Sequence, residues 1–290
     1  MGVVRRTLAT AIALILGSGS TAGAAPSGVR PLKGVKTWVA YYGAAAEAAA
    51  DLAKFDVVVL DPIHHPPLQA VKRHGALVLM YLSLAEVNVN HPEYATVGQE
   101  PWVLGPNPRW PEARGLDVRA AGYERWLLDR LVPRALAAPV NGLFLDTADS
   151  ALELERVEPG RFGGAMASLE RVLVALRRAR PGALLVLNGG LPLAERLATI
   201  LDGVAVESVW TEYDFAGKAY RPRAEDDARQ RVTLARRVSD LGLPVLTLEY
   251  APPEQGPWVR RLIGLARGEG FVPYVSMIGL GRVFTHTLPR

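Results

Sequence analysis

Eight short apolar runs recur along the chain, and each one ends at polar or turn-forming residues. They lie at residues 37–41, 56–60, 76–82, 142–145, 183–187, 203–206, 244–248 and 271–275. Several are almost continuously apolar, which is typical of strands buried on both faces of a parallel sheet. Segments with the 3.6-residue periodicity of helices separate them, at residues 44–54, 68–74, 121–137, 164–179, 193–200, 224–241 and 258–268.

Eight strands that alternate with helices over about 250 residues predict an α/β fold, a single (β/α)8 TIM barrel. Glycine follows three of the predicted helices as a C-terminal stop, at Gly75, Gly182 and Gly242. A doubly wound sheet is the competing architecture, but no Gly-x-Gly-x-x-Gly sequence occupies the first strand-to-helix turn. We therefore predict one domain at residues 36–290, with residues 25–35 as a short lead-in.

The first 24 residues have the pattern of an export signal. Arg5 and Arg6 precede an apolar run at residues 8–16 that is too short to span a bilayer, and Ala22 and Ala24 form the small-x-small pattern of a cleavage site. No other stretch is apolar for about 18 residues. We predict a signal peptide at residues 1–24 that is cleaved near Ala24, a secreted or periplasmic protein, and no stable membrane insertion after cleavage. The arginine pair leaves Sec and twin-arginine export both open.

The composition excludes several classes of protein. The chain has no cysteine, which excludes a disulfide framework, a thiolate zinc site and a cysteine nucleophile. Its formal net charge of +4 reflects 33 Lys and Arg against 29 Asp and Glu. The basic residues are mostly arginines scattered among acids on predicted helix faces. We interpret them as solvated helix surface rather than a phosphate-binding stripe, and predict no nucleic-acid partner.

Acidic or amide side chains follow six consecutive predicted strands, from the second to the seventh. They are Asp61, Glu86, Asp146 with Asp149, Asn188, Glu207 and Glu249. In a (β/α)8 barrel the carboxyl ends of all strands meet at one face, where active sites lie. A single such acid is readily explained as a helix cap or an arginine partner, but six in succession predict a functional ring. Crowded acids raise one another's pKa values, which favours one protonated carboxyl beside one ionised carboxylate.

Two carboxyl groups that flank a sugar ring can hydrolyse a glycosidic bond. We predict Asp146 and Glu207 as this catalytic pair, and the residues alone leave open which of them is the acid. Aromatic residues near the same strand ends are candidates for stacking on sugars. The predicted substrate-binding residues are Tyr41, Asp61, Tyr81, Glu86, Asp149, Asn188, Trp210, Tyr213, Glu249 and Tyr250. The long segment 83–119 contains Trp102 and Trp110, and we expect it to form an ordered flank of a cleft.

Two other functions are compatible with these residues. A carbohydrate-binding barrel without catalysis would carry the same ring of polar groups. A metal-dependent barrel hydrolase would use Asp61 with His64 and His65, although adjacent histidines seldom point at one ion. We therefore predict no metal and no cofactor.

Five segments resemble glycoside hydrolase family 114, the endo-α-1,4-polygalactosaminidase type. They are WVAYYG at 38–43, FDVVVLD at 55–61, YLSLAE at 81–86, GLFLDT at 142–147 and GVAVES at 203–208. The resemblance extends from about residue 36 to the C-terminus. It implies a (β/α)8 enzyme that cleaves α-1,4-linked galactosamine-containing polysaccharide, with Asp146 as nucleophile and Glu207 as acid/base. Where the family usually has glycine before the acid of the third strand, this chain has Ala85, which could narrow a subsite.

The predicted mouth of the barrel also carries Glu212 and Asp214, and no lysine lies at the strand ends. Such a mouth is electronegative, and it favours a cationic, partly deacetylated amino-sugar polymer over uronates or nucleic acid. We expect a monomer whose partner is this polysaccharide.

Overall fold

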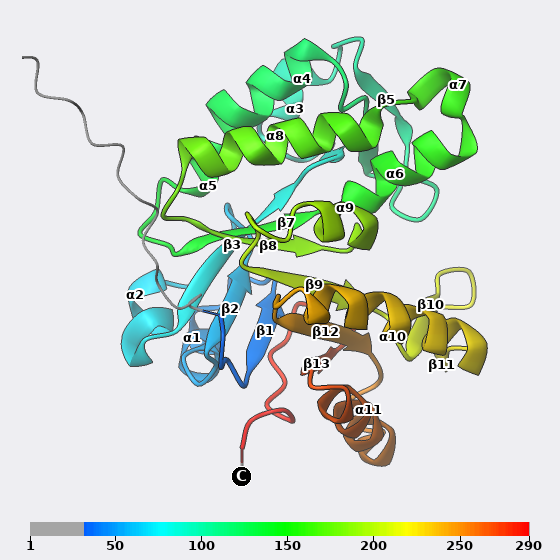
Figure 1. The fold of residues 1–290 in the computed structure, drawn as a ribbon. Helices are drawn as coiled ribbons and strands as arrows, with labels where there is room; N and C mark the ends of the chain where they lie inside the picture. The colour runs from blue at the N-terminus through cyan, green and yellow to red at the C-terminus, as the bar shows by residue number, and fades with distance from the viewer. Residues whose placement is uncertain (1–31, 290) are drawn as a thin grey trace, which may run out of the picture.

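The computed structural model describes residues 32–289, and its centre is an eight-stranded parallel sheet rolled into a nearly closed barrel (Figure 1). The strands are, in spatial order, β1 (Trp38–Tyr41), β2 (Val57–Leu60), β3 (Leu77–Ser83), β7 (Gly142–Asp146), β8 (Leu184–Asn188), β9 (Gly203–Glu207), β12 (Val245–Tyr250) and β13 (Val272–Ser276). Every neighbouring pair is parallel. The predicted barrel is confirmed, while the predicted signal peptide at residues 1–24 lies outside the described residues.

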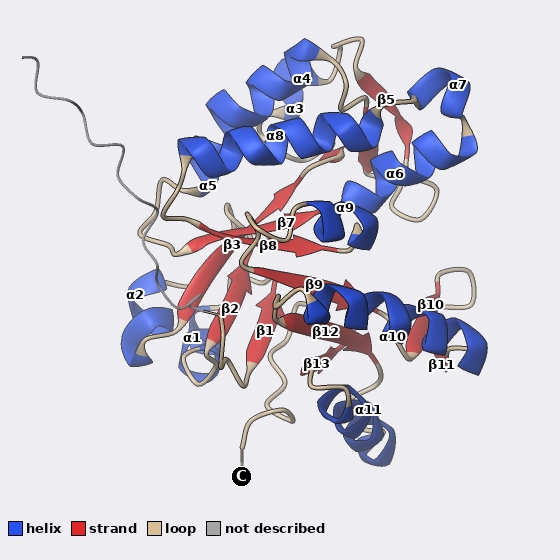
Figure 2. Cartoon of the chain, in the orientation of Figure 1, coloured by secondary structure: helices blue, strands red, loops and turns tan. Residues whose placement is uncertain are grey.

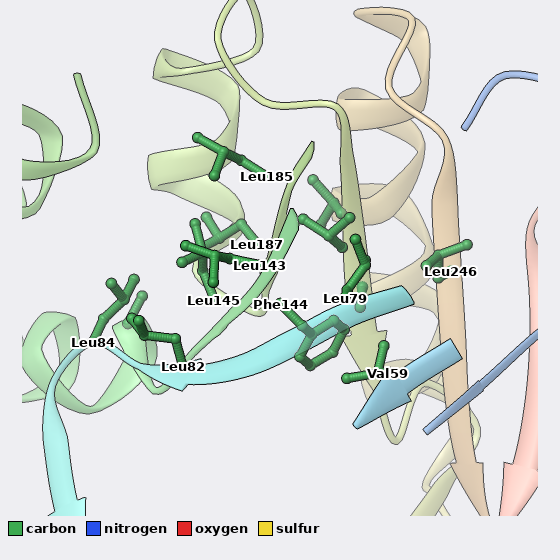
Figure 3. Close-up of a cluster of buried hydrophobic side chains, with 14 of the residues drawn as sticks. Val59, Leu79, Leu82, Leu84, Leu143, Phe144, Leu145, Leu185, Leu187 and Leu246 are labelled. Atoms are coloured by element: carbon green, nitrogen blue, oxygen red, sulfur yellow. The ribbon is translucent and has the colours of Figure 1, made fainter. Parts of the chain in front are cut away.

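Side chains alternate between the barrel interior and the surrounding helices. Trp38 stacks with Phe144 of β7, across the barrel interior, at 6.2 Å between ring centroids. It also contacts the tilted ring of Tyr274, on β13, at 6.0 Å. Figure 3 shows Phe144 on the opposite side of β7 from Leu143 and Leu145. Because every second residue of a strand faces the same side, this packing fixes which strand-end residues reach the mouth.

β1 and β13, the two ends of the sheet, contact each other without a strand pairing in the described residues. The indole Nε1–H of Trp38 donates to the carbonyl of Val272 at 2.9 Å, and the N–H of Tyr42 donates to the carbonyl of Leu280 at 2.9 Å. After β13 the described chain continues to residue 289 without a further helix. This tail runs between α1 and α11 (Figure 1), in the place of the eighth barrel helix.

Helices cover the outside of the barrel (Figure 2). They are α1 (Ala49–Leu52), α2 (Leu68–Val71), α3 (Tyr94–Val97), α4 (Ala121–Trp126), α5 (Val132–Ala135), α6 (Ala148–Val157), α7 (Pro159–Phe162), α8 (Ala165–Ala179), α9 (Leu191–Arg196), α10 (Glu225–Asp240) and α11 (Gly256–Gly268). Short 3-10 helices precede α1 at Ala46–Ala48 and follow α2 at Lys72–His74, and a π segment, Leu127–Leu131, joins α4 to α5. Within residues 32–289, none of the helices has the length and apolar character needed to cross a membrane.

Two insertions extend the loops after β3 and β9. The first forms an antiparallel sheet in the order β4 (Glu86–Asn88), β6 (Ala113–Leu116), β5 (Val103–Pro106). The second is a hairpin of β10 (Thr211–Asp214) and β11 (Ala219–Pro222), which was not predicted. In the first insertion Trp102 is buried against α4, whereas Trp110 is exposed in the β5–β6 turn. The prediction of an ordered segment at 83–119 is confirmed.

Candidate active site

A cleft of about 590 Å³ opens at the carboxyl ends of the barrel strands. Strands β3, β7, β9 and β12, the first insertion and the C-terminal tail all contribute to its walls. The acidic residues that line it are Asp61, Glu86, Glu112, Asp146 and Glu207. A concave site with several converging polar groups is the usual form of a ligand-binding or active site.

One amide joins the two predicted catalytic acids. Asp146 ends β7 and Glu207 ends β9, and Asn188 ends β8, the strand between them. The Asn188 Nδ2 group donates to Asp146 Oδ1 at 2.8 Å and to Glu207 Oε1 at 2.7 Å. Because both hydrogen bonds share the Nδ2 atom, the distance between those two oxygens cannot exceed the sum of the two bond lengths, about 5.5 Å.

Tyrosine hydroxyls complete the surroundings of the pair. Tyr250 Oη donates to Glu207 Oε2 at 2.7 Å. Tyr81 forms a hydrogen bond with Asp146, which also accepts from the backbone N–H of Thr147. Tyr42 packs edge-on against Tyr81, with 5.3 Å between ring centroids. The Asp146 carboxylate thus accepts three hydrogen bonds, whereas the Glu207 carboxylate accepts two, from Asn188 and Tyr250.

The two carboxyl groups differ in how readily they hold a proton. Burial, and then the charge of Asp146, raise the pKa of Glu207 to about 7. Burial also raises the pKa of Asp146, but hydrogen bonds from Thr147, Asn188 and Tyr81 oppose this shift. Since the more heavily hydrogen-bonded carboxylate keeps its charge, we assign the proton of the pair to Glu207 near neutral pH.

The residues directly after both acids have left-handed backbone conformations. Thr147 has φ 65° and Ser208 has φ 54°, which is uncommon outside glycine. Contacts hold each turn in place: Thr147 Oγ1 accepts from the N–H of Ala85 at 2.8 Å, and the Ser208 N–H donates to the Leu248 carbonyl at 2.8 Å. Strained backbone of this kind clusters at functional sites. Here it turns the chain out of the strand immediately after each carboxyl group.

Several predicted substrate-binding residues do line the cleft. Tyr81, Glu86, Asp61 and Tyr250 all contribute to its wall. Glu86 Oε1 accepts from Asn107 Nδ2 at 2.8 Å, which ties it to the first insertion. Asp61 accepts two backbone N–H groups of its own turn, at 2.7 and 2.6 Å. The predicted Asn188 is buried, and reaches the acids from between them.

Strand alternation takes two other predicted residues away from the cleft. Trp38 faces the barrel interior, so Tyr42 also faces inward and Tyr41 faces outward and is buried. Tyr250 faces inward, so Glu249 faces outward. Its carboxylate accepts from the N–H groups of residues 209 and 210 and from the hydroxyl of Thr211, and burial raises its pKa to about 7. Glu249 therefore holds the loop after β9 and does not line the cleft.

Three further predicted residues lie beside the cleft rather than in its wall. Asp149 accepts from the N–H of Gly190 at 2.8 Å, in the first turn of α6. Trp210 packs with Trp258 against the apolar cluster around α11. Tyr213 belongs to the β10–β11 hairpin, where it contacts Tyr220.

Sequence reasoning did not predict several cleft residues as site residues. Tyr42, Trp110, Glu112 and Thr147 all line the cleft. The period-two pattern that starts from Trp38 was the signal that could have identified Tyr42. No comparable pattern identifies the residues of the insertion, because their position depends on how that segment folds back over the barrel.

The residues of the metal alternative are not grouped around a common point. His64 Nδ1 lies 3.6 Å from Asp61 Oδ1, but His65 Nδ1 is hydrogen-bonded to the carbonyl of Pro66 at 2.8 Å. Across residues 32–289, no three His, Asp or Glu side chains are placed to share a metal ion. The arrangement of these side chains therefore does not support a metal-dependent hydrolase that uses Asp61, His64 and His65.

Comparison with known proteins places the chain among glycoside hydrolases. Its structure is similar to the glycoside hydrolase domain of PelA from Pseudomonas aeruginosa, with 28% identity, a TM-score of 0.77, and 86% of this chain and 98% of that chain covered. It shares its fold with Ega3 from Aspergillus fumigatus, solved in complex with galactosamine, at 14% identity, a TM-score of 0.64 and 84% and 92% coverage. None of the curated protein sequences matches. The sequence model of glycoside-hydrolase family GH114 matches residues 18–288, so the chain belongs to this family and is a glycoside hydrolase.

Proposed function

We propose that this glycoside hydrolase cleaves α-1,4-linked galactosamine-containing polysaccharide with retention of configuration, using Asp146 and Glu207. The observation that carries the proposal is the Asn188 amide, which bonds both carboxyl groups and keeps their nearest oxygens within about 5.5 Å. Retaining enzymes separate their carboxyl groups by about 5–5.5 Å, and inverting enzymes by about 6.5–9.5 Å to admit a water. The spacing therefore supports a covalent intermediate.

In the first step the Asp146 carboxylate attacks the anomeric carbon while Glu207 gives its proton to the glycosidic oxygen. The carbon–oxygen bond breaks, and the leaving chain departs with that proton as a hydroxyl group. In the second step the Glu207 carboxylate takes a proton from water, whose oxygen attacks the anomeric carbon and displaces Asp146. Because its pKa is raised, Glu207 carries the proton that the first step needs. The hydrogen-bond donors around Asp146 keep the Asp146 carboxylate ionised.

The charge of the cleft supports an amino-sugar substrate. Asp61, Glu86 and Glu112 line it in addition to the catalytic pair, whereas its arginine, Arg134, is paired with Glu93 at 3.3 Å. An acidic cleft attracts ammonium groups and repels uronates. The structural neighbour Ega3, which was solved in complex with galactosamine, is consistent with this choice of substrate.

The catalytic pair is tested by a reducing-end assay on partly deacetylated α-1,4-galactosaminan. Asp146→Asn and Glu207→Gln should each lower turnover by about 10²–10⁴-fold. The matched control is Glu153→Gln, an exposed carboxylate on α6 outside the cleft, which should retain full activity. Turnover that survives both cleft substitutions would contradict the pair. Polymer binding by the wild type without any turnover would favour the carbohydrate-binding alternative.

The stereochemical outcome is tested separately by proton NMR of the first product. A retaining enzyme releases the α-anomer first, and the β-anomer follows by mutarotation. Initial formation of the β-anomer would contradict the role of Asp146 as nucleophile.

We also propose that the protein is exported and acts as a monomer. The arginine pair, apolar run and small-x-small site in residues 1–24 support export. Mass spectrometry of the protein recovered outside the cytoplasm should find a mature N-terminus near residue 25. Light scattering should give the mass of a single chain.

A further inference from the structure

Two exposed aromatic side chains, one from each insertion, meet beside the cleft. Trp110 lies in the β5–β6 turn, is 46% exposed and lines the cleft, and Phe215 lies in the β10–β11 turn and is 36% exposed. Their ring centroids are 5.2 Å apart, with the rings nearly perpendicular. Figure 1 shows the two insertions on the same side of the barrel. Two exposed aromatic rings in contact beside a cleft offer apolar surface to a ligand that extends out of it.

Both turns hold their aromatic residue in a defined position. Asn107 Oδ1 accepts from the N–H of Trp110 at 3.3 Å, and its Nδ2 donates to Glu86 Oε1 at 2.8 Å. The position of Trp110 is thus coupled to an acid of the cleft wall. In the hairpin, Asp214 accepts from two backbone N–H groups that follow Phe215, at 3.0 and 2.9 Å. The backbone of both turns is therefore fixed before a ligand arrives, which lowers the entropy cost of binding.

The aromatic contacts continue along the rim. Phe215 contacts Tyr213 at 5.1 Å, and Tyr213 contacts Tyr220 at 4.9 Å between ring centroids. The hydroxyl of Tyr220 accepts from the N–H of Ile278 at 3.2 Å, and Ile278 lines the cleft. This row of aromatic side chains, from Trp110 to Tyr220, therefore contacts the cleft wall at both of its ends.

We propose that Trp110, which contacts the nearly perpendicular ring of Phe215, forms an outer subsite that stacks one sugar ring of the polysaccharide. Pyranose rings carry an apolar C–H face, and a flat aromatic surface binds such a face through area removed from water. An ammonium group on the same sugar adds a cation–π attraction, and Glu112, two residues from Trp110, supplies an opposite charge. This inference rests on the proposed function and adds a chain-length dependence to it: long chains occupy the subsite more fully than the shortest cleavable oligomers do.

The subsite is tested by comparing Trp110→Ala and Phe215→Ala with wild type on α-1,4-galactosaminan oligomers of increasing length. A stacking contact that buries on the order of 50 Å² of apolar surface changes affinity about ten-fold. We therefore expect kcat/KM to fall about ten-fold on long oligomers, mainly through KM, and to fall by less on the shortest oligomer that is cleaved. Trp110→Phe should keep most of the long-chain activity. The control is Leu265→Ala, an exposed apolar residue on α11, which should match wild type.

An unchanged kcat/KM for Trp110→Ala on long oligomers would overturn the subsite, and so would an equal fall on short and long ones. The proposed function is judged separately, by hydrolysis in the wild type. Calorimetry with the Asp146→Asn variant measures binding without turnover, and adding Trp110→Ala should weaken its affinity for a long oligomer about ten-fold. Hydrolysis by wild type with no effect of Trp110→Ala overturns the subsite alone, whereas absence of both hydrolysis and binding overturns both proposals.

Discussion

Removal of the Tyr250 hydroxyl should make Glu207 a weaker acid. Tyr250→Phe deletes the donor that lies 2.7 Å from Glu207 Oε2 and leaves the ring in place. This hydrogen bond stabilises the ionised carboxylate and so lowers its pKa. A hydrogen bond to a charged group contributes about 1.5–3 kcal/mol, part of which the protonated form retains. A differential of about 1.4 kcal/mol corresponds to a rise of about one pKa unit, from a wild-type value of about 7.

The alkaline limb of the kcat/KM profile measures this change. Glu207 must be protonated to donate to the leaving oxygen, so activity falls as the pH rises through its pKa. In Tyr250→Phe this fall should move upward by about one pH unit. The amino groups of the substrate titrate as well, but they do so equally for both enzymes when the same oligomer is used. The difference between the two profiles therefore reports Glu207.

Tyr42→Phe is the matched control. Tyr42 lies in the same cleft, and among the described residues its hydroxyl is not a hydrogen-bond donor to Glu207. Its removal should leave the alkaline limb in place, whatever it does to the rate. An unshifted or acid-shifted limb in Tyr250→Phe would refute the reasoning, as would an equal shift in Tyr42→Phe.

Three further substitutions test the supports of the site. Asn188→Asp places a third carboxylate between the catalytic pair and removes their shared donor, so kcat/KM should fall at least about 100-fold with an unchanged circular dichroism spectrum. Thr147→Ala removes the acceptor of the Ala85 N–H, and urea unfolding should show a loss of about 1–3 kcal/mol; an unchanged midpoint contradicts this. The folded pKa of Glu249, about 7, exceeds its unfolded value, so the folded state binds more protons between about pH 4.5 and 7 and loses stability as the pH rises through this window. Between the same two pH values the free energy of unfolding of Glu249→Gln should fall by about 3 kcal/mol less than that of the wild type. An equal fall in both proteins refutes the raised pKa of Glu249.

The barrel could be predicted because its strands are buried on both faces. The run predicted at 203–206 corresponds to Gly203–Glu207, and the predicted helices at 164–179 and 224–241 end within a residue or so of α8 and α10. Elements with little buried surface were missed. Helix α6 was not predicted, and it buries only Ala148 and Ala151. The β10–β11 hairpin has polar residues on both faces and packs through aromatic contacts.

The position of the site could be predicted, but not which strand-end side chains face it. A charged residue directly after a buried run must be solvated or paired, and this placed Asp146 and Glu207 at the mouth. Position at a strand end alone does not distinguish Tyr41 from Tyr42. The inward direction is set by tertiary packing, here by the contacts of Trp38 with Phe144 on β7 and Tyr274 on β13.

The spacing of the catalytic pair follows from barrel geometry and unequal side-chain lengths. β7 and β9 are two strands apart, and adjacent strands lie about 4.8 Å apart, so their backbones are separated by about 9–10 Å. Asn188 ends the strand between them, where its amide reaches both acids. The short side chain of Asp146 and the longer one of Glu207 then converge on it to within about 5.5 Å. Strand order thus places an amide between the two acids, and the carboxyl spacing that results is the one expected of the retaining mechanism proposed above.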